Sequence, residues 1–225
     1  MPARTHVVDS GGTARLLRRL AVVDSGGTTR MVRRAFVVDS GGTSRLVFVS
    51  ELLVTYTSGS GTETVPSGMT QVVITMWGGG AGGVDGDAGA GGNGGGAGGY
   101  STRTAACAGG NTMSYAVGAA GGNSTVSGTL TGGGAISMAA NGTTTNAGGT
   151  ASGGTTNTTG GAGELGESEP SVGGDGGDSP NGGVGGTGGL GAGGSGSAPG
   201  GGGAGSGATG APGAGARGEI RFFYT

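Results

Sequence analysis

The sequence contains no lysine, one histidine, one cysteine and few aromatic residues. The single cysteine, Cys107, excludes an intramolecular disulfide framework, and we interpret it as a small buried apolar side chain. One histidine and one cysteine are too few for a zinc cluster. Without lysine there is no Gly-Lys-Ser/Thr loop for phosphate. No apolar run approaches the roughly 20 residues of a membrane-spanning helix.

The sequence also offers little material for catalysis. Asp-Ser-Gly-Gly, a tetrapeptide found around serine-protease nucleophiles, occurs three times, but only His6 is available as its base. Asp85 with Asp87, or Asp175 with Asp178, has the chemistry to ligate calcium, although solvated turn carboxylates are the commoner role. We therefore expect a non-enzymatic protein without cofactor or metal.

Charge divides the chain into two parts. Residues 1–50 carry +5 and residues 51–225 carry −7, which give the net charge of −2. In the first part, Val-Val-Asp-Ser-Gly-Gly-Thr recurs at Val7–Thr13, Val22–Thr28 and Val37–Thr43, in steps of 15 residues. Turn residues between β-branched runs predict strand–turn–strand units. Such short units bury little surface alone, so residues 1–50 are expected to be fibrous, oligomerising β-repeats.

Most arginines of the chain lie in these repeats. Docking to a partner or oligomerisation is the role we assign to seven of them, Arg15, Arg18, Arg19, Arg30, Arg33, Arg34 and Arg45. Nucleic-acid binding is the alternative, but the repeats have no interleaved aromatic platform and place aspartates beside the arginines.

The second part, residues 51–225, predicts a small β-sandwich with a long insertion. Residues 51–134 and 219–225 form its β frame, with strands expected at Gln71–Trp77, Tyr100–Thr104, Thr112–Val117, Ser124–Ser127 and Glu219–Thr225. Alternation at Met113, Tyr115 and Val117 indicates one buried and one solvated face. Because a terminal strand usually pairs with earlier ones, residues 219–225 are expected to close the domain.

Residues 135–218 form the glycine-rich tract of the insertion. Large apolar side chains are too rare there to build a hydrophobic core. Residues 182–190, however, repeat Gly-Gly-X with a period of three, which is the period of the polyproline II helix. The tract is therefore expected to be a polyglycine II-like insertion, with a flexible glycine loop as the alternative.

Several motifs carry a family resemblance. They are Thr-Val-Pro-Ser-Gly at 64–68, Val-Val-Ile-Thr-Met-Trp-Gly-Gly-Gly at 72–80, Gly-Gly-Tyr-Ser at 98–101 and Ala-Arg-Gly-Glu-Ile-Arg-Phe at 216–222. This pattern resembles the glycine-rich domain of bacteriophage tail-fibre and minor tail proteins. The 15-residue repeats resemble N-terminal segments that accompany this domain in phage virion proteins, and their spacing is similar to that of triple β-spiral shafts.

The resemblance implies a structural protein of the phage tail fibre or of the tail tip or baseplate. Such a protein is made in the host cytoplasm, which fits the lack of an apolar secretory signal at the N-terminus, and is exposed on the virion exterior. It implies other virion proteins and a bacterial surface receptor as partners, and a homo-oligomer in which a trimer is favoured. We expect neither nucleic-acid binding nor membrane insertion.

Host-receptor contact is implied for loops at the tip of stacked polyglycine helices. Three stretches have the most side-chain character, residues 138–146, 164–172 and 175–181. Of these we predict the second as the contact, through Glu164, Leu165, Glu167, Glu169 and Val172. A purely structural capsid decoration or head fibre protein is the alternative. A glycine-rich ice-binding protein is disfavoured, because the arginine repeats have no role in it.

Overall fold

The computed structural model describes residues 52–87, 89–168 and 171–225, together with the backbone of six strands between residues 6 and 49. The chain divides into two compact units, Met1–Leu52 with Thr225, and Leu53–Tyr224. Every regular element among the described residues is a β-strand, so the protein is mainly β.

The first unit contains three antiparallel hairpins. They are β1 (His6–Val8) with β2 (Ala14–Leu16), β3 (Leu20–Val23) with β4 (Thr29–Val32), and β5 (Arg34–Val38) with β6 (Ser44–Val49). Their registers are equivalent, because Val7 lies opposite Arg15, Val22 opposite Arg30, and Val37 opposite Arg45. Of the predicted docking arginines, Arg18, Arg19 and Arg33 lie outside the described residues.

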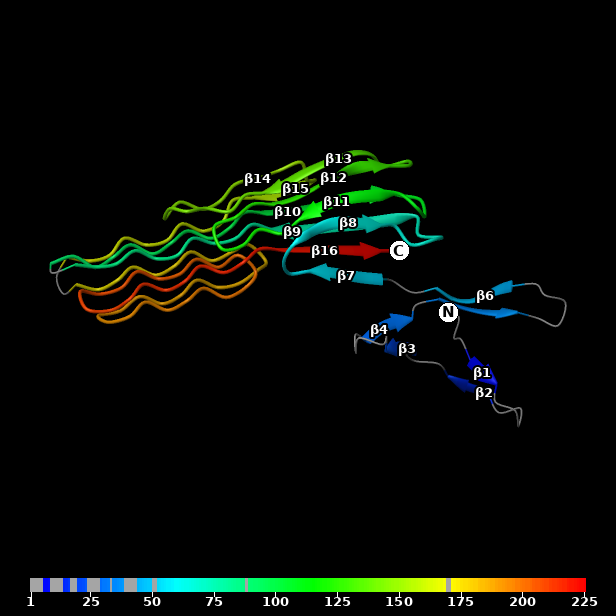
Figure 1. Ribbon diagram of the computed structural model, residues 1–225, viewed down its shortest axis with the longest axis horizontal. Helices are drawn as coiled ribbons and strands as arrows, with labels where there is room; N and C mark the ends of the chain where they lie inside the picture. The colour runs from blue at the N-terminus through cyan, green and yellow to red at the C-terminus, as the bar shows by residue number, and fades with distance from the viewer. Residues whose placement is uncertain are drawn as a thin grey trace. The chain divides into compact units, whose positions relative to one another are not determined.

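The second unit is built on two antiparallel five-stranded sheets (Figure 1). The first sheet has the order β15-β10-β9-β16-β7, and the second has the order β14-β13-β12-β11-β8. The first comprises β7 (Leu52–Tyr56), β9 (Gln71–Trp77), β10 (Tyr100–Ala106), β15 (Thr156–Thr158) and β16 (Glu219–Tyr224). The second comprises β8 (Ser60–Thr64), β11 (Thr112–Ala116), β12 (Ser124–Leu130), β13 (Gly134–Ala140) and β14 (Ala151–Ser152).

The five strands expected in the frame are present, with ends that differ by a few residues. β9 has the predicted bounds, and the C-terminal strand returns to pair with it, placing Phe222 opposite Ile74. Strands continue beyond residue 134, where the glycine-rich tract was expected to begin, because β13 pairs with β12 along seven residues. Met138 is therefore a buried strand residue and not part of a loop.

Alternating side chains of the two sheets meet to form the hydrophobic core. Every second residue of β9 and β16 is fully buried, and so are residues of β11, β12 and β13; they include Val72, Ile74, Met76, Met113, Val126, Ile136, Ile220 and Phe222. Burial of each large side chain contributes about 1.5–3 kcal/mol. Tyr56 of the first sheet stacks on Tyr115 of the second, with ring centroids 3.9 Å apart, so the sheets face each other.

Candidate functional site

Residues 78–99, 141–150 and 159–218 form what we call the glycine bundle. In Figure 1 these segments run side by side from one end of the two sheets of the second unit. Residues 78–99 connect β9 to β10, and residues 159–218 connect β15 to β16, so the frame holds both ends of each excursion. The sequence assigned only the later part of the bundle to the glycine-rich tract.

Backbone hydrogen bonds join the bundle's segments with a period of three residues. Gly91, Gly94 and Ala97 donate to the carbonyls of Glu167, Glu164 and Gly161, each at 2.8 Å. Gly92, Gly95 and Gly98 donate to a different neighbouring segment, namely to the carbonyls of Ser206, Gly203 and Gly200, also at 2.8 Å. Successive amides of one segment thus reach different neighbours, and residues 94–99 and 199–207 are buried among the others.

Close approach of these segments explains the glycine content. A Cβ atom on Gly94 would lie 1.9 Å from the carbonyl oxygen of Asp175, and one on Gly205 would lie 1.9 Å from that of Gly92. Real Cβ atoms essentially never approach backbone atoms within 3.0 Å. Main-chain hydrogen bonds therefore hold this part of the protein in place of side-chain burial.

Two carboxylates supply acceptors where the backbone ladder would otherwise leave amides unpaired. Asp175 Oδ1 accepts the Gly188 amide at 2.6 Å, and Asp178 Oδ1 accepts the Gly185 amide at 2.7 Å. These bonds alternate with backbone bonds between the same two segments. Both aspartates thus have a structural role in the ladder. In the part of the chain that the structure describes, no three acidic, histidine or cysteine side chains gather as metal ligands.

Four loops from distant parts of the sequence meet at the bundle's far end from the sheets, which we call the loop end (Figure 1). Their described residues are 84–87 and 89–91, 164–168 and 171–173, 187–192, and 206–210. Gly91 donates to the Glu167 carbonyl at 2.8 Å, and Gly207 donates to the Gly191 carbonyl at 2.8 Å. The Gly86 amide donates to Ser206 Oγ at 3.0 Å. Backbone contacts therefore fix all four loops to one scaffold.

The predicted receptor-contact residues belong to one of these four loops. Glu164 and Glu167 are exposed, Leu165 is 68% exposed, and Val172 is half-buried. Glu169 lies outside the described residues. The sequence did not identify the other three loops as neighbours of this one, since nothing in their residues indicates the partners of their amides.

The loop end combines exposed apolar and acidic side chains. Val84 is 55% exposed and Leu190 is 64% exposed, in addition to Leu165. The four loops contain no lysine, arginine or histidine, while Asp85, Asp87, Glu164 and Glu167 belong to two of them. A partner at this end would meet apolar side chains among negative charges and main-chain amides.

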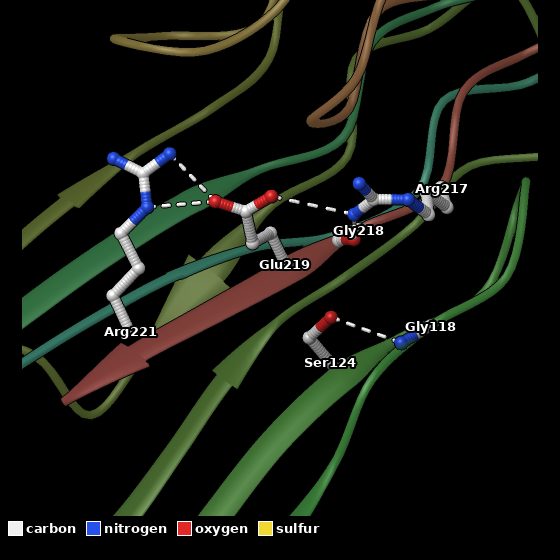
Figure 2. A network of polar contacts seen from close by, with 6 residues as sticks. All are labelled: Gly118, Ser124, Arg217, Gly218, Glu219 and Arg221. Carbon is white, nitrogen blue, oxygen red and sulfur yellow. Dashed lines mark hydrogen bonds and ion pairs between the residues drawn. The ribbon is translucent and has the colours of Figure 1, made fainter. Parts of the chain in front are cut away.

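An ion-pair network around one buried carboxylate lies where the other end of the bundle joins the sheets (Figure 2). Glu219, at the start of β16, is 6% exposed and binds Arg217 at 3.3 Å and Arg221 at 2.6 Å. The Arg221 guanidinium lies 4.8 Å from the ring centroid of Trp77. Trp77 Nε1 donates to the Pro180 carbonyl at 2.8 Å, which ties β9 to the bundle.

A second buried polar cluster links the two sheets. Glu63 of β8 is 7% exposed and accepts hydrogen bonds from the hydroxyls of Tyr56 and Tyr224, at 2.5 and 2.9 Å. Burial, together with the neighbouring Glu63 carboxylate, raises the pKa of both tyrosines above the ordinary value. Burial also raises the pKa of the Cys107 thiol. The two tyrosine hydroxyls and the Glu63 carboxylate form hydrogen bonds with each other inside the fold, so this cluster has a structural role.

No protein-family model matches the chain, and no curated protein has a matching sequence. No helix among the described residues is long and apolar enough to cross a membrane.

Proposed function

We propose that the glycine bundle is a lattice of polyglycine II-like helices inserted into a β-sandwich. The period of three in the donors supports this, because a polyproline II helix has three residues per turn and no internal hydrogen bonds. Its amides are free to bond outward, as those of residues 91, 92 and 94–98 do. The crowding at Gly94 and Gly205 supports it too, since only glycine permits neighbouring backbones to approach so closely.

The chain as a whole is, in this proposal, a non-enzymatic virion structural protein of a phage tail fibre or of the tail tip or baseplate. The observation that carries the proposal is the loop end, where four separate loops share one scaffold held by main-chain bonds. Because main-chain bonds supply most of that scaffold, most loop side chains can vary while the frame is kept. This is the physical requirement for a surface that recognises host receptors.

The parts of the chain then have separate roles. The loop of residues 164–172 contacts the bacterial surface receptor through Glu164, Leu165, Glu167, Glu169 and Val172. Residues 1–50 dock the protein to other virion proteins or join copies of it, with a trimer favoured. The protein is displayed on the particle exterior.

Adsorption of virions carrying single substitutions tests the receptor role. Leu165→Ser removes an exposed apolar side chain at the loop end, and we expect the adsorption rate constant to fall about five- to tenfold. Val184→Ser is the matched control, because Val184 is 61% exposed and lies outside the four loops of the loop end. Equal adsorption by both variants and by wild-type particles would contradict the receptor role.

Immuno-electron microscopy of the same particles tests the position. We expect label on the tail, and we expect deletion of residues 1–50 to remove the protein from particles. Label on the capsid, with adsorption unaffected by loop substitutions, would instead support the capsid decoration or head fibre role. Wild-type incorporation of the truncated chain would contradict the docking role of the repeats.

A further inference from the structure

The second unit has four strands at the edges of its sheets, and three of them are poor templates for further pairing. β14 has two residues and β15 has three. β8 contains Gly61 and directs the charged Glu63 into the protein. Short strands, glycine and inward-pointing charge are the devices by which proteins prevent edge-to-edge association.

The fourth edge strand, β7, has none of these devices. It has five residues, Leu-Leu-Val-Thr-Tyr, without charge, glycine or proline, and among the described strands it pairs only with β16. Leu53 is 48% exposed on the outer face of the sheet. An apolar, unprotected edge of this kind is stable in solution when another strand covers it.

The sequence of β7 is compatible with pairing to itself. Leu52, Val54 and Tyr56 alternate with the more exposed Leu53 and Thr55, and Tyr56 contacts the opposite sheet through Tyr115. An antiparallel pair centred on Val54 keeps this alternation in both copies, because it places Leu53 of one copy opposite Thr55 of the other. No charged residues meet in that register, so there is no like-charge repulsion.

We propose that β7 is a self-association edge, at which a second copy of this chain adds its own β7 about a two-fold axis centred on Val54. The two first sheets then form one continuous ten-strand sheet across the dimer. This inference does not depend on the virion role. If residues 1–50 also form a trimer, the two interfaces together give a closed hexamer with D3 symmetry, or a larger assembly.

Two double variants of the full chain test the register directly. Leu53→Lys/Thr55→Lys places like charges opposite each other twice in the dimer, whereas Leu53→Lys/Thr55→Glu places opposite charges there. We expect the first variant to have half the wild-type mass in sedimentation velocity, with a dissociation constant about tenfold weaker or more, and the second to keep the wild-type mass. Equal masses for the two variants would overturn the proposal, whether both are associated or both are dissociated.

Oxidative cross-linking gives a second measurement that does not require the association to be weakened. Leu53→Cys/Thr55→Cys brings two cysteine pairs across the two-fold axis, at the short Cβ separations of directly opposed strand residues. We expect a covalent dimer from this variant, and none from Leu53→Cys or Thr55→Cys alone, because each single cysteine faces a residue without a thiol. A dimer formed equally by the single variants, or absent from the double variant, would contradict this register and favour a different partner strand.

Discussion

The hydroxyl of Tyr224 donates a 2.9 Å hydrogen bond to Oε1 of Glu63, which joins the penultimate residue of the chain to the edge strand of the opposite sheet. The two residues are 161 positions apart in the sequence. This bond closes the frame around the glycine bundle, because β16 follows the bundle directly and Glu63 also accepts a hydrogen bond from Tyr56.

Tyr224→Phe should therefore destabilise the protein. The substitution keeps the ring and leaves the buried Glu63 carboxylate with one hydrogen bond fewer, so we expect a loss of about 1–3 kcal/mol in the free energy of unfolding. Urea unfolding measures the change. The exposed Thr104→Ala on β10 is the control and should change stability by less than about 0.5 kcal/mol. Similar midpoints for the two variants would show that the bond contributes nothing.

Stability should also fall at high pH. The pKa of Tyr56 and of Tyr224 is raised in the folded protein, so their contribution is complete below about pH 10, where unfolded tyrosine titrates, and is lost as the pH rises above it. Above pH 10 the unfolded state releases protons that the folded state retains. For Tyr224 alone this lowers the free energy of unfolding by about 1.4 kcal/mol per pH unit. Urea unfolding between pH 8 and about pH 11 should show the decline, and Tyr224→Phe should make it shallower.

Alanine substitutions within the bundle should destabilise the protein at glycines that have no space for a Cβ atom, and not at glycines that have it. Gly94→Ala forces a Cβ atom against the Asp175 carbonyl, and we expect a loss of at least about 3 kcal/mol, or failure of the bundle to form. Gly189→Ala is the control, since a Cβ atom there would meet no atom within 4 Å. Thermal unfolding compares the two variants. A tolerant Gly94→Ala would mean that the segments are held more loosely than the hydrogen bonds indicate.

Asp178→Ala should expose one amide of the ladder. The Gly185 amide loses its acceptor, so we expect faster hydrogen exchange at that residue and a loss of about 0.5–1.5 kcal/mol. Asp85→Ala removes an equal charge elsewhere in the bundle and should leave exchange at Gly185 unchanged. If both variants had the same effect, net charge and not the hydrogen bond would be responsible.

The β frame could be predicted from sequence where apolar residues run or alternate, as in β9 and β16. β8 was missed because its residues, Ser-Gly-Thr-Glu-Thr, are small or polar, and β13 because glycine, serine and alanine dominate it; both give little hydrophobic signal. The same lack of side chains concealed the role of residues 78–99, which were included in the predicted β frame although most of residues 91–99 are buried in the bundle.

The candidate site was predictable only in part. One loop of the loop end was selected for its side chains, but its three neighbours are determined by amide-to-carbonyl pairings, which any residue except proline can make. The Glu63–Tyr224 and Trp77–Pro180 contacts join residues more than 100 positions apart, and no spacing in the sequence indicates them. Such pairings become visible only when the chain is folded.

The period of three in the ladder also constrains how the gene can change in length. An insertion of one or two codons within a bundle segment would shift every later amide away from its acceptor and bring substituted residues to crowded positions. An insertion or deletion of three residues restores both the direction of the amides and the place of the glycines. Natural or laboratory variants of this protein should therefore differ in bundle length by multiples of three residues, with paired changes in adjoining segments and free variation where the loops turn.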